Sequence, residues 1–423
     1  MPSLVLLLIP VALLVALLAT WAARGVGRRL NALDGAGVAG QVKAAPRRVP
    51  NTGGVGIFLG FALPLLVMVI AVLTADTRAW LMDWQWGQSN LQRVAGISPA
   101  TLAGLAESLR EHAGWALAVL GGVLLLHLMG LVDDRKPLPA IPKLLAMVAV
   151  SLGVLVLTQT RMFTFVDGFA GGTWASYALT LVWILVITNA MNFLDNMDGL
   201  SGGVGAIASG SFMTIAIFQE QWFIAGCFAL LLGALLGFLW FNKPGRGGGG
   251  ASVFMGDGGS LVLGFLLAFL SVRITYATMI PDTPLPSSEP PIFDSARDGI
   301  RVYPFSTTWH AIFAPLVVLA IPLYDLTSVV LLRLRQGKNP MVGDLQHISH
   351  RFVQRGLSKP TAVAVIWGFA GAAGLAGILL TRTDTAGAIL IATQVALLLL
   401  VLAAIEFAGG ASAKPINKPQ GAP

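Results

Sequence analysis

The sequence is poor in cysteine and in charge. A single cysteine, Cys227, occurs among 423 residues, so the chain can form no internal disulfide and no cysteine-rich metal site. Charged residues make up 11% of the chain and hydrophobic residues 56%, whereas a soluble domain carries about 25% charged residues. These values exclude an ordinary soluble domain and predict a polytopic membrane protein.

Three further features are missing from the sequence. The first 23 residues have no basic n-region and continue for a full bilayer thickness, so we interpret them as a retained first helix and not as a cleaved signal. No soluble domain is inserted, and no internal repeat of the kind found in many secondary transporters is visible. The net charge of +7 comes from Lys and Arg spread over the loops, which favours a role in orientation over nucleic-acid binding.

Apolar windows recur along the chain, at about 20 residues for each crossing of a bilayer. They lie near residues 2–23, 54–74, 115–132, 143–160, 174–192, 202–218, 221–241, 257–280, 307–332, 361–381 and 386–408. We therefore predict an all-α fold, a polytopic membrane bundle of about eleven helices. Residues 1–410 are expected to form one transmembrane domain, followed by a short polar tail at 411–423. The longest stretches outside the bilayer are expected at 75–114 and at 281–306, the second rich in proline.

The distribution of Lys and Arg predicts the orientation of the bundle. If the N-terminus lies outside, the loops of the cytoplasmic side and the C-terminal tail hold 19 of the 27 Lys and Arg residues, and the opposite side holds 7. The positive-inside rule therefore places the loops at 24–50, 133–143, 242–256 and 333–360 in the cytoplasm. Four polar motifs that end or begin hydrophobic spans all fall on this side.

The first motif is the pair Asp133-Asp134, at the end of an apolar span. Adjacent carboxylates repel each other, so both stay ionised only if a cation or a basic side chain compensates them. A bland alternative is a solvated helix end, neutralised by Arg135 and Lys136.

The second motif is a run of amides and carboxylates with i, i+3 spacing: Asn189, Asn192, Asp195 and Asp198. On a helix or at its fraying end these side chains would form one stripe. Such a stripe suits the base and ribose of a nucleotide, or the oxygen ligands of a hard cation. The alternative is a polar loop that caps two helices.

The third motif, FMGDGGS, places Asp257 among glycines directly before an apolar span. We predict that the glycines let backbone amides turn toward a phosphate while Asp257 holds a metal. The alternative is an N-cap turn in which Asp257 or Ser260 is the cap.

The fourth motif, HISHR, contains His347, His350 and Arg351, which could bind phosphates through charge-assisted hydrogen bonds. Zinc is less suited to it, because no third ligand or cysteine is near; a basic surface loop is the alternative. Asp325, within the ninth span, is a further carboxylate that needs a partner. His127, inside the third span, is expected to hydrogen-bond a neighbouring helix.

Together the four motifs supply ligands for a hard cation and groups that bind phosphates and nucleotides. Phosphoryl transfer needs little beyond positioning and charge neutralisation by Mg²⁺. The residues therefore predict Mg²⁺-dependent chemistry on a phosphorylated substrate linked to a nucleotide. Its co-substrate is expected to be a lipid, because a soluble reaction would not need so many helices.

In its motifs and their order, the sequence resembles the polyprenyl-phosphate N-acetylhexosamine-1-phosphate transferase family, which is glycosyltransferase family 4. The similarity runs from VPNTGGVGI, beginning at Val49, to HISHRFVQRGLS, ending at Ser358. Lys143 stands where the family has a lysine after its paired aspartates, and IPLYD, ending at Asp325, also fits.

The resemblance implies transfer of a sugar-1-phosphate from a UDP-sugar to undecaprenyl or another polyprenyl phosphate, with release of UMP. The implied cofactor is Mg²⁺, with Mn²⁺ as an alternative, and the implied place is the bacterial inner membrane, with the active site on the cytoplasmic face. The product would initiate synthesis of a cell-envelope polysaccharide. Nucleic acid is not an expected partner, and a homodimer is left open.

The resemblance also implies residue roles. Asp133, Asp134 and Asp257 would be catalytic, with Asp257 and Asp134 on the metal. The substrate would contact Asn189, Asn192, Asp195, Asp198, His347, His350, Arg351 and Arg48. Two departures from the family pattern are Asn196, where the family has glycine, and Gly258, where threonine is frequent.

The HISHR form is more similar to the N-acetylglucosamine-1-phosphate branch than to the branch that transfers phospho-N-acetylmuramoyl-pentapeptide. That second branch remains an alternative. A cation-coupled transporter would place its carboxylates near mid-span along a pathway, and a non-catalytic relative that binds lipid carriers would lack a metal ligand. The sequence favours the transferase over both.

Overall fold

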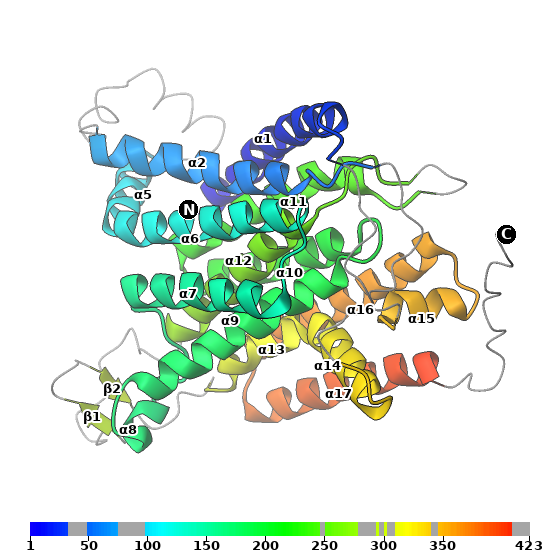
Figure 1. Ribbon diagram of the computed structural model, residues 1–423. Helices are drawn as coiled ribbons and strands as arrows, with labels where there is room; N and C mark the ends of the chain where they lie inside the picture. The colour runs from blue at the N-terminus through cyan, green and yellow to red at the C-terminus, as the bar shows by residue number, and fades with distance from the viewer. Residues whose placement is uncertain are drawn as a thin grey trace, which may run out of the picture.

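The computed structural model describes residues 1–32, 49–74, 98–245, 250–277, 293–295, 300–302, 309–339 and 346–407. Within these ranges the chain is a bundle of helices that lie side by side, with α1 at one edge and α17 at the other (Figure 1). Among the described residues, ten helices are long and apolar enough to cross a membrane, or up to eleven if one bent pair counts as a single span. The prediction of an all-α membrane bundle is confirmed.

The long helices follow the apolar windows of the sequence closely. They are α1 (Pro2–Arg29), α2 (Gly54–Thr74), α6 (Ala113–Asp133), α7 (Ala140–Thr158), α9 (Trp174–Leu194), α10 (Leu200–Phe218), α11 (Trp222–Asn242), α12 (Asp257–Ala277), α16 (Lys359–Leu380) and α17 (Thr385–Phe407). The predicted ninth span is instead broken, and consists of η1 (Trp309–Phe313), α13 (Ala314–Val318) and α14 (Ala320–Arg335). Its two halves, His310–Val318 and Ala320–Arg335, meet at an angle of 66°.

The remaining elements were not predicted. They are α5 (Pro99–Glu111), α8 (Val166–Ala170), α15 (Ile348–Gln354) and an antiparallel hairpin of β1 (Phe293–Ser295) and β2 (Ile300–Val302). The hairpin lies in the proline-rich stretch, where the sequence shows little periodicity. Two strands of three residues do not change the fold class.

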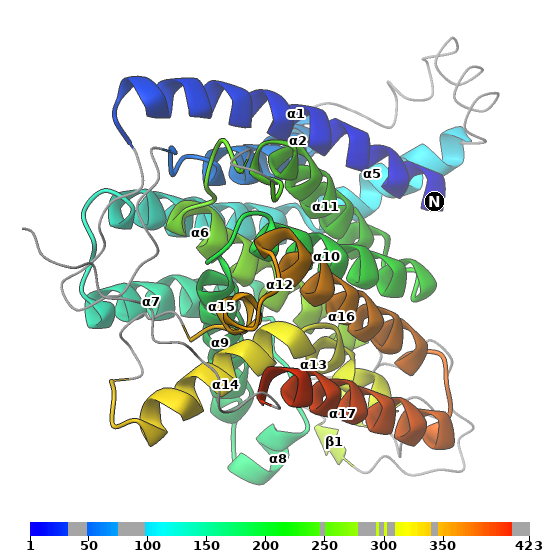
Figure 2. The same ribbon diagram turned by 90° about the vertical axis from the view of Figure 1, so that its right-hand side faces the viewer.

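Helix α12 is the centre of the bundle. In its membrane-length window 94% of the residues are buried, against 17% in α17. Figure 2 shows α12 enclosed among the other helices and α17 at the periphery. A helix that is apolar all round and buried belongs to a core, whereas an apolar exposed face suits lipid. The first turn of α12 is therefore held from several sides.

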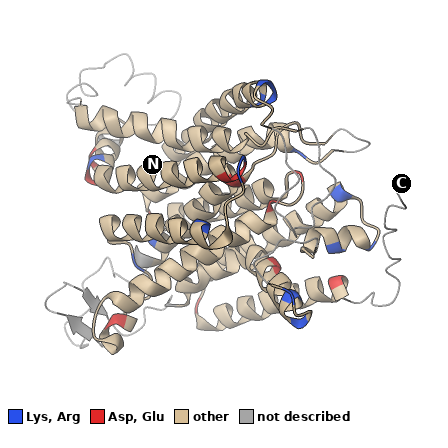
Figure 3. Cartoon of the chain, viewed as in Figure 1, with Lys and Arg blue, Asp and Glu red and all other residues tan. Residues whose placement is uncertain are grey.

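Most charged residues of the long helices lie near the helix ends (Figure 3). Figure 3 shows mostly uncharged helix bodies, with Lys and Arg near helix ends and in the connecting turns. The end of α6, the beginning of α7 and the end of α9 lie at the same end of the bundle, because Asp134, Lys143 and Asn192 each contact the start of α12. That end carries the candidate site.

Candidate active site

The first turn of α12 is capped by a side chain from another helix. The Oδ1 atom of Asp134 accepts from the backbone N–H of Asp257 at 3.0 Å, and its Oδ2 atom accepts from Gly258 at 3.3 Å. Gly256 precedes the helix with φ of +66°, a conformation that favours glycine. A Cβ atom at this position would also lie 2.5 Å from Oδ2 of Asp134. Both the fold of the turn and the approach of Asp134 therefore require glycine at position 256.

The amides of this turn are occupied within the protein. Asp257 and Gly258 donate to Asp134, while the N–H groups of Gly259 and Ser260 lie 3.1 and 3.0 Å from the carbonyl oxygen of Gly256. The prediction that the glycine-rich turn directs its amides at a phosphate is therefore wrong. The alternative cap, Asp257 or Ser260, is also not what is found, since Asp134 of the α6 end supplies it.

Glycine contacts bring three helices together at this turn. A Cβ atom added to Gly54 of α2 would lie 2.3 Å from the nitrogen of Gly259. One added to Gly130 of α6 would lie 2.4 Å from the nitrogen of Gly258. Because only hydrogen fits at both positions, α2 and α6 touch the backbone of α12 directly, and the side chains of the turn have little freedom to shift.

Three carboxylates, one lysine and one asparagine meet here, and we call Asp133, Asp134, Lys143, Asn192 and Asp257 the acidic cluster. Lys143 Nζ donates to Asp133 Oδ2 at 2.7 Å and also to Asp257 Oδ2. Asn192 Nδ2 donates to the other oxygen of Asp257 at 2.9 Å. The cluster thus joins the ends of α6 and α9 to the beginnings of α7 and α12.

The acidic cluster has more negative than positive groups. Burial, and next the charge of Asp257, raise the pKa of Asp134 to about 7, although the two amide donors favour its ionised form. Asp133 and Asp257 share the single ammonium group of Lys143. A site with three carboxylates and one ammonium attracts a further cation.

Two of these carboxylates fit the needs of Mg²⁺. Asp133 and Asp257 already direct one oxygen each at a common cation, the ammonium of Lys143. In phosphate sites Mg²⁺ is bound by one or two carboxylates together with phosphate oxygens and water. No group of three or more His, Cys, Asp or Glu side chains arranged for a metal occurs within the described ranges. Asp133 and Asp257 could each supply one oxygen to Mg²⁺, and the predicted metal itself stays a prediction. The metal role predicted for Asp134 stays a prediction, because both of its oxygens serve as the cap.

The asparagine and aspartate run is only partly helical. Asn189 and Asn192 lie on α9, and Asn189 Nδ2 donates to its own helix at Leu185. The helix ends at Leu194, and Asp195 is its C-cap. The predicted single stripe is therefore wrong beyond Asn192.

The turn after α9 is tied to the segment before α12. Asp198 accepts from the N–H of Ala251 at 3.0 Å, and Asn242 accepts from Gly199 at 2.8 Å. Gly199 has φ of +75°, which suits glycine in this tight turn. Asn242, whose Nδ2 also donates to Val253, was missed from the sequence because it looked like the ordinary end of an apolar span.

The histidine motif forms a second group of polar side chains. His347 precedes α15, and its Nδ1 atom lies 2.8 Å from Oδ2 of Asp325. The other oxygen of Asp325 accepts from the N–H of Ile348 at 2.8 Å, which caps α15. The prediction that Asp325 needs a partner is confirmed.

Arg351 faces acidic groups of the protein. It pairs with Glu406 of α17, donates to Ser328 Oγ at 2.7 Å and lies 4.0 Å from Asp325. We call Tyr324, Asp325, His347, Arg351 and Glu406 the α15 network. His350 is half-buried on the same short helix. The predicted contacts of these groups with substrate phosphates stay predictions.

Two contacts connect the two groups. Ser349 of α15 donates to Oδ1 of Asn196, in the turn after α9. The rings of Phe193 and His347 pack edge to face, with centroids 5.9 Å apart. The α15 network therefore adjoins the end of α9, whose Asn192 belongs to the acidic cluster.

Other predicted residues take the following places. Arg48 lies outside the described residues. The loop that follows it lies beside the segment that precedes Asp257. The backbone N–H of Phe254 donates to the carbonyl oxygen of Pro50, and the N–H of Gly53 donates to that of Phe254, each at 2.8 Å. His127 Nδ1 lies 2.8 Å from the carbonyl oxygen of Gly258. The predicted contact of His127 with a neighbouring helix is confirmed.

Comparisons with known proteins find similarity to one family of enzymes. The family model described as "Glycosyl transferase family 4" matches residues 116–275, a stretch that contains the whole acidic cluster. A probable undecaprenyl-phosphate N-acetylglucosaminyl 1-phosphate transferase of Bacillus subtilis is 29% identical over 256 residues, or 59% of this chain and 62% of the relative.

Two further relatives carry similar descriptions. The undecaprenyl-phosphate alpha-N-acetylglucosaminyl 1-phosphate transferase of Escherichia coli K12 is 27% identical over 62% of this chain and 64% of its own length. A decaprenyl-phosphate N-acetylglucosaminephosphotransferase of Mycobacterium tuberculosis is 26% identical over 82% of this chain and 76% of its own length. The chain thus spans less than two thirds of the first two relatives. Over the stretch that contains the acidic cluster, the chain is therefore similar to glycosyl transferase family 4, and its relatives carry the names given above.

Proposed function

We propose that this protein transfers a sugar-1-phosphate from a UDP-sugar to a polyprenyl phosphate, giving a polyprenyl-diphosphate sugar and UMP. One observation carries the proposal: Asp133 and Asp257 each direct an oxygen at the ammonium group of Lys143, where the ends of several membrane-length helices meet. An acidic, cation-binding site at this depth suits a reaction between a soluble diphosphate and a lipid phosphate. The names of the three relatives support the polyprenyl phosphate as acceptor and an N-acetylglucosamine phosphate as the group transferred.

We propose Mg²⁺ as the cofactor, held by Asp257 and Asp133. When bound, it would neutralise charge on the pyrophosphate of the donor. Asn192 orients Asp257 through a hydrogen bond to the oxygen that does not face Lys143. Lys143 holds the two carboxylates together and supplies a positive charge beside them. Asp134 fixes the start of α12 and so the direction of Asp257.

The overall reaction joins an oxygen of the lipid phosphate to the β-phosphorus of the UDP-sugar. The bond between that phosphorus and its bridging oxygen to the α-phosphate breaks, and UMP leaves with the electron pair. Lys143, together with Mg²⁺ when bound, would offset part of the negative charge of the two substrates. His347, His350 and Arg351, together with Asn189, Asp195 and Asp198, are proposed to contact the substrates around this point. The hydrocarbon of the lipid would stay among the apolar outer faces of the bundle.

The proposed sugar is N-acetylglucosamine. The three relatives described above are named for that sugar, and no feature of the described residues favours the phospho-N-acetylmuramoyl-pentapeptide donor instead. The proposed location is the bacterial inner membrane with the site in the cytoplasm and the N-terminus outside. The excess of Lys and Arg in the loops on the side of the site supports this orientation.

The test is release of UMP by the purified full-length protein. The assay would contain Mg²⁺ and undecaprenyl phosphate, with UDP-N-acetylglucosamine and UDP-N-acetylmuramoyl-pentapeptide as donors in parallel. We expect UMP from the first donor alone, dependent on both lipid and metal. UMP from the second donor alone would overturn the sugar. Folded protein that releases no UMP from these or other UDP-sugars would overturn the reaction and favour a transporter or a lipid-binding protein.

A further inference from the structure

The last turn of α17 contacts α15 through consecutive residues. Glu406 forms an ion pair with Arg351, and the guanidinium of Arg351 lies 5.7 Å from the ring centre of Phe407. Arg355, the residue that follows the last residue of α15, donates to the carbonyl oxygen of Ile405. Cations are favoured near the unpaired carbonyl groups at the C-terminal end of a helix. The end of α17 therefore binds Arg351 of α15 and Arg355 at the end of that helix.

The ion pair between Glu406 and Arg351 is buried. Glu406 is 1% exposed and Arg351 is 9% exposed. A buried carboxylate without its partner costs far more free energy than a surface one, so each residue holds the other in place. Tyr324 of α14 also donates to Glu406, and three helices thus meet at this one carboxylate.

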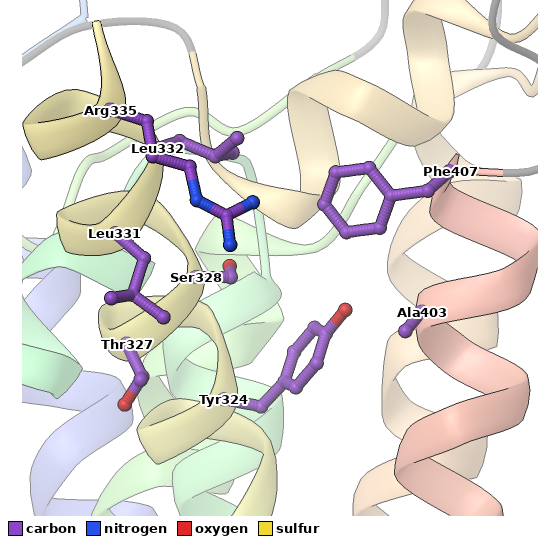
Figure 4. A pocket seen from close by; sticks show the side chains of 8 residues that line it. All are labelled: Tyr324, Thr327, Ser328, Leu331, Leu332, Arg335, Ala403 and Phe407. Carbon is purple, nitrogen blue, oxygen red and sulfur yellow. The ribbon is translucent and has the colours of Figure 1, made fainter.

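Little else joins α14 to α17 at this level. A cavity of about 300 Å³ lies between them, lined by Tyr324, Thr327, Ser328, Leu331, Leu332, Arg335, Ala403 and Phe407. Figure 4 shows the hydroxyl of Tyr324 directed toward α17 across this space, and the guanidinium of Arg335 directed into it. Because close packing is interrupted here, the position of α17 against α14 depends on the polar contacts of Glu406.

The contacts continue from Glu406 to His347. Arg351 bonds Ser328 and lies 4.0 Å from Asp325, which in turn holds both His347 and the N–H of Ile348. His347 is 5% exposed, and its ring is held by the hydrogen bond between Nδ1 and Asp325. Loss of Arg351 from its place would remove the positive charge 4.0 Å from Asp325 and the donor to Ser328, and would so loosen the carboxylate that holds His347.

We propose that Glu406 is a positioning residue: through Arg351 and Asp325 it sets the orientation of His347, so that α17 acts as a clamp on the histidine helix. The effect of this clamp on turnover rests on the proposed function, in which His347 contacts substrate phosphates. Glu406 itself touches no substrate in this scheme. Its effect passes along the chain of contacts in the α15 network.

The experiment measures the reactivity of His347 and needs no turnover. Full-length protein in detergent would be treated with diethyl pyrocarbonate, and labelling of each histidine followed by peptide mass spectrometry. The variants are Glu406→Ala and Glu406→Gln, with Thr393→Ala as the matched control. Thr393 is exposed on α17, and its hydroxyl bonds only its own helix at Ile389. His310, buried beside Thr383, reports on general unfolding in the same molecules.

We expect Glu406→Ala to raise the labelling rate of His347 roughly tenfold, as for a local opening made easier by about 1.4 kcal/mol. Glu406→Gln should give a smaller rise, because it keeps an acceptor but loses the charge. His310 should not change in either variant, and Thr393→Ala should match the wild type at both histidines. Turnover of the UDP-sugar should fall more in Glu406→Ala than in Glu406→Gln, in parallel with the rise in labelling of His347.

Two results would overturn the clamp. One is an unchanged His347 rate in both Glu406 variants. The other is an equal rise at His310 and His347 in both, which would make Glu406 a general stabiliser of the fold. If the wild-type protein turns over no donor, the proposed function fails, yet the labelling of His347 still decides the clamp.

Discussion

The acidic cluster and the α15 network hold their polar side chains in different ways. The acidic cluster sits on the most buried helix, where Gly54 and Gly130 bring two backbones against the first turn of α12. The α15 network lies at the periphery and is held by charged side chains around a cavity. Close backbone packing resists small shifts, whereas ion pairs between long side chains allow them.

This difference suits two tasks in the proposed reaction. Carboxylates that share a cation must keep a fixed spacing, which a packed core provides. Groups that grip phosphates must accept a substrate and release its product, and local stability at such places is commonly low. The family match at residues 116–275 covers the first region and not the second.

The largest expected effect comes from the acidic cluster. Asp257→Asn should lower turnover by about a thousandfold, or about 4 kcal/mol of activation free energy, because it removes a negative charge from the shared cation site. UMP release at limiting Mg²⁺ measures it. The thermal unfolding midpoint should stay close to that of the wild type, since asparagine keeps the shape of the side chain.

Exposed Glu107 on α5 offers the control, as Glu107→Gln also removes one negative charge. That variant should retain wild-type turnover. Near-normal turnover of Asp257→Asn at limiting Mg²⁺ would show that Asp257 does not hold the metal. The acidic cluster would then not differ from the α15 network by being the cation site.

The next effect belongs to the α15 network. Asp325→Asn should destabilise the protein by about 3 kcal/mol, because a buried charge is lost opposite His347 and Arg351 while one acceptor for Ile348 remains. The measurement is chemical or thermal unfolding in detergent. Ser328→Ala, which removes the hydrogen bond from Arg351 and the bond that Ser328 donates to the carbonyl oxygen of Asp325, should cost about 1 kcal/mol. Equal costs for the two variants would show that Asp325 is not the centre of the network.

The sequence predicted the acidic cluster better than the α15 network for a physical reason. Asp133, Asn192 and Asp257 stand at the ends of long apolar windows, and a carboxylate there is conspicuous. The ends of several spans meet at one face once the helices alternate, so their meeting could be expected. What could not be expected is that Asp134 would cap α12, because an i, i+123 contact leaves no local signal.

Glu406 is a functional candidate that was not predicted from the sequence. It stands two residues before the end of the window at 386–408, and its neighbours are apolar. The rule that an acid in an apolar span needs a partner was applied to Asp325 and applies to Glu406 as well. Its partner Arg351 lies 55 residues earlier, so the sequence alone could identify the need but not the pair. Helix α15 was missed because seven residues are too short for a clear period.

A smaller effect tests the backbone packing of the first region. Gly130→Ala should destabilise the protein by about 1–3 kcal/mol, since the new methyl group meets the backbone of Gly258 at 2.4 Å. Gly121→Ala is the matched control on the same helix, because a Cβ atom there meets nothing within 4 Å. Unfolding midpoints of the two variants measure the contrast. If both variants unfold at the same temperature, the direct contact of α6 with α12 is not what holds the acidic cluster.

The smallest effect concerns the hydrogen bond that joins the two regions. Ser349→Ala removes the donor to Asn196 and should cost about 1 kcal/mol, the usual worth of one neutral hydrogen bond. Ser209→Ala is the matched control: this serine is equally buried, but its hydroxyl bonds only the carbonyl of Gly205 in its own helix. Unfolding would measure both variants, and a double-mutant cycle with Asn196→Ala would isolate the pair. A coupling near zero would mean that this hydrogen bond does not join the two regions, and that their proximity rests on the packing of α9 against α14 and of Phe193 against His347.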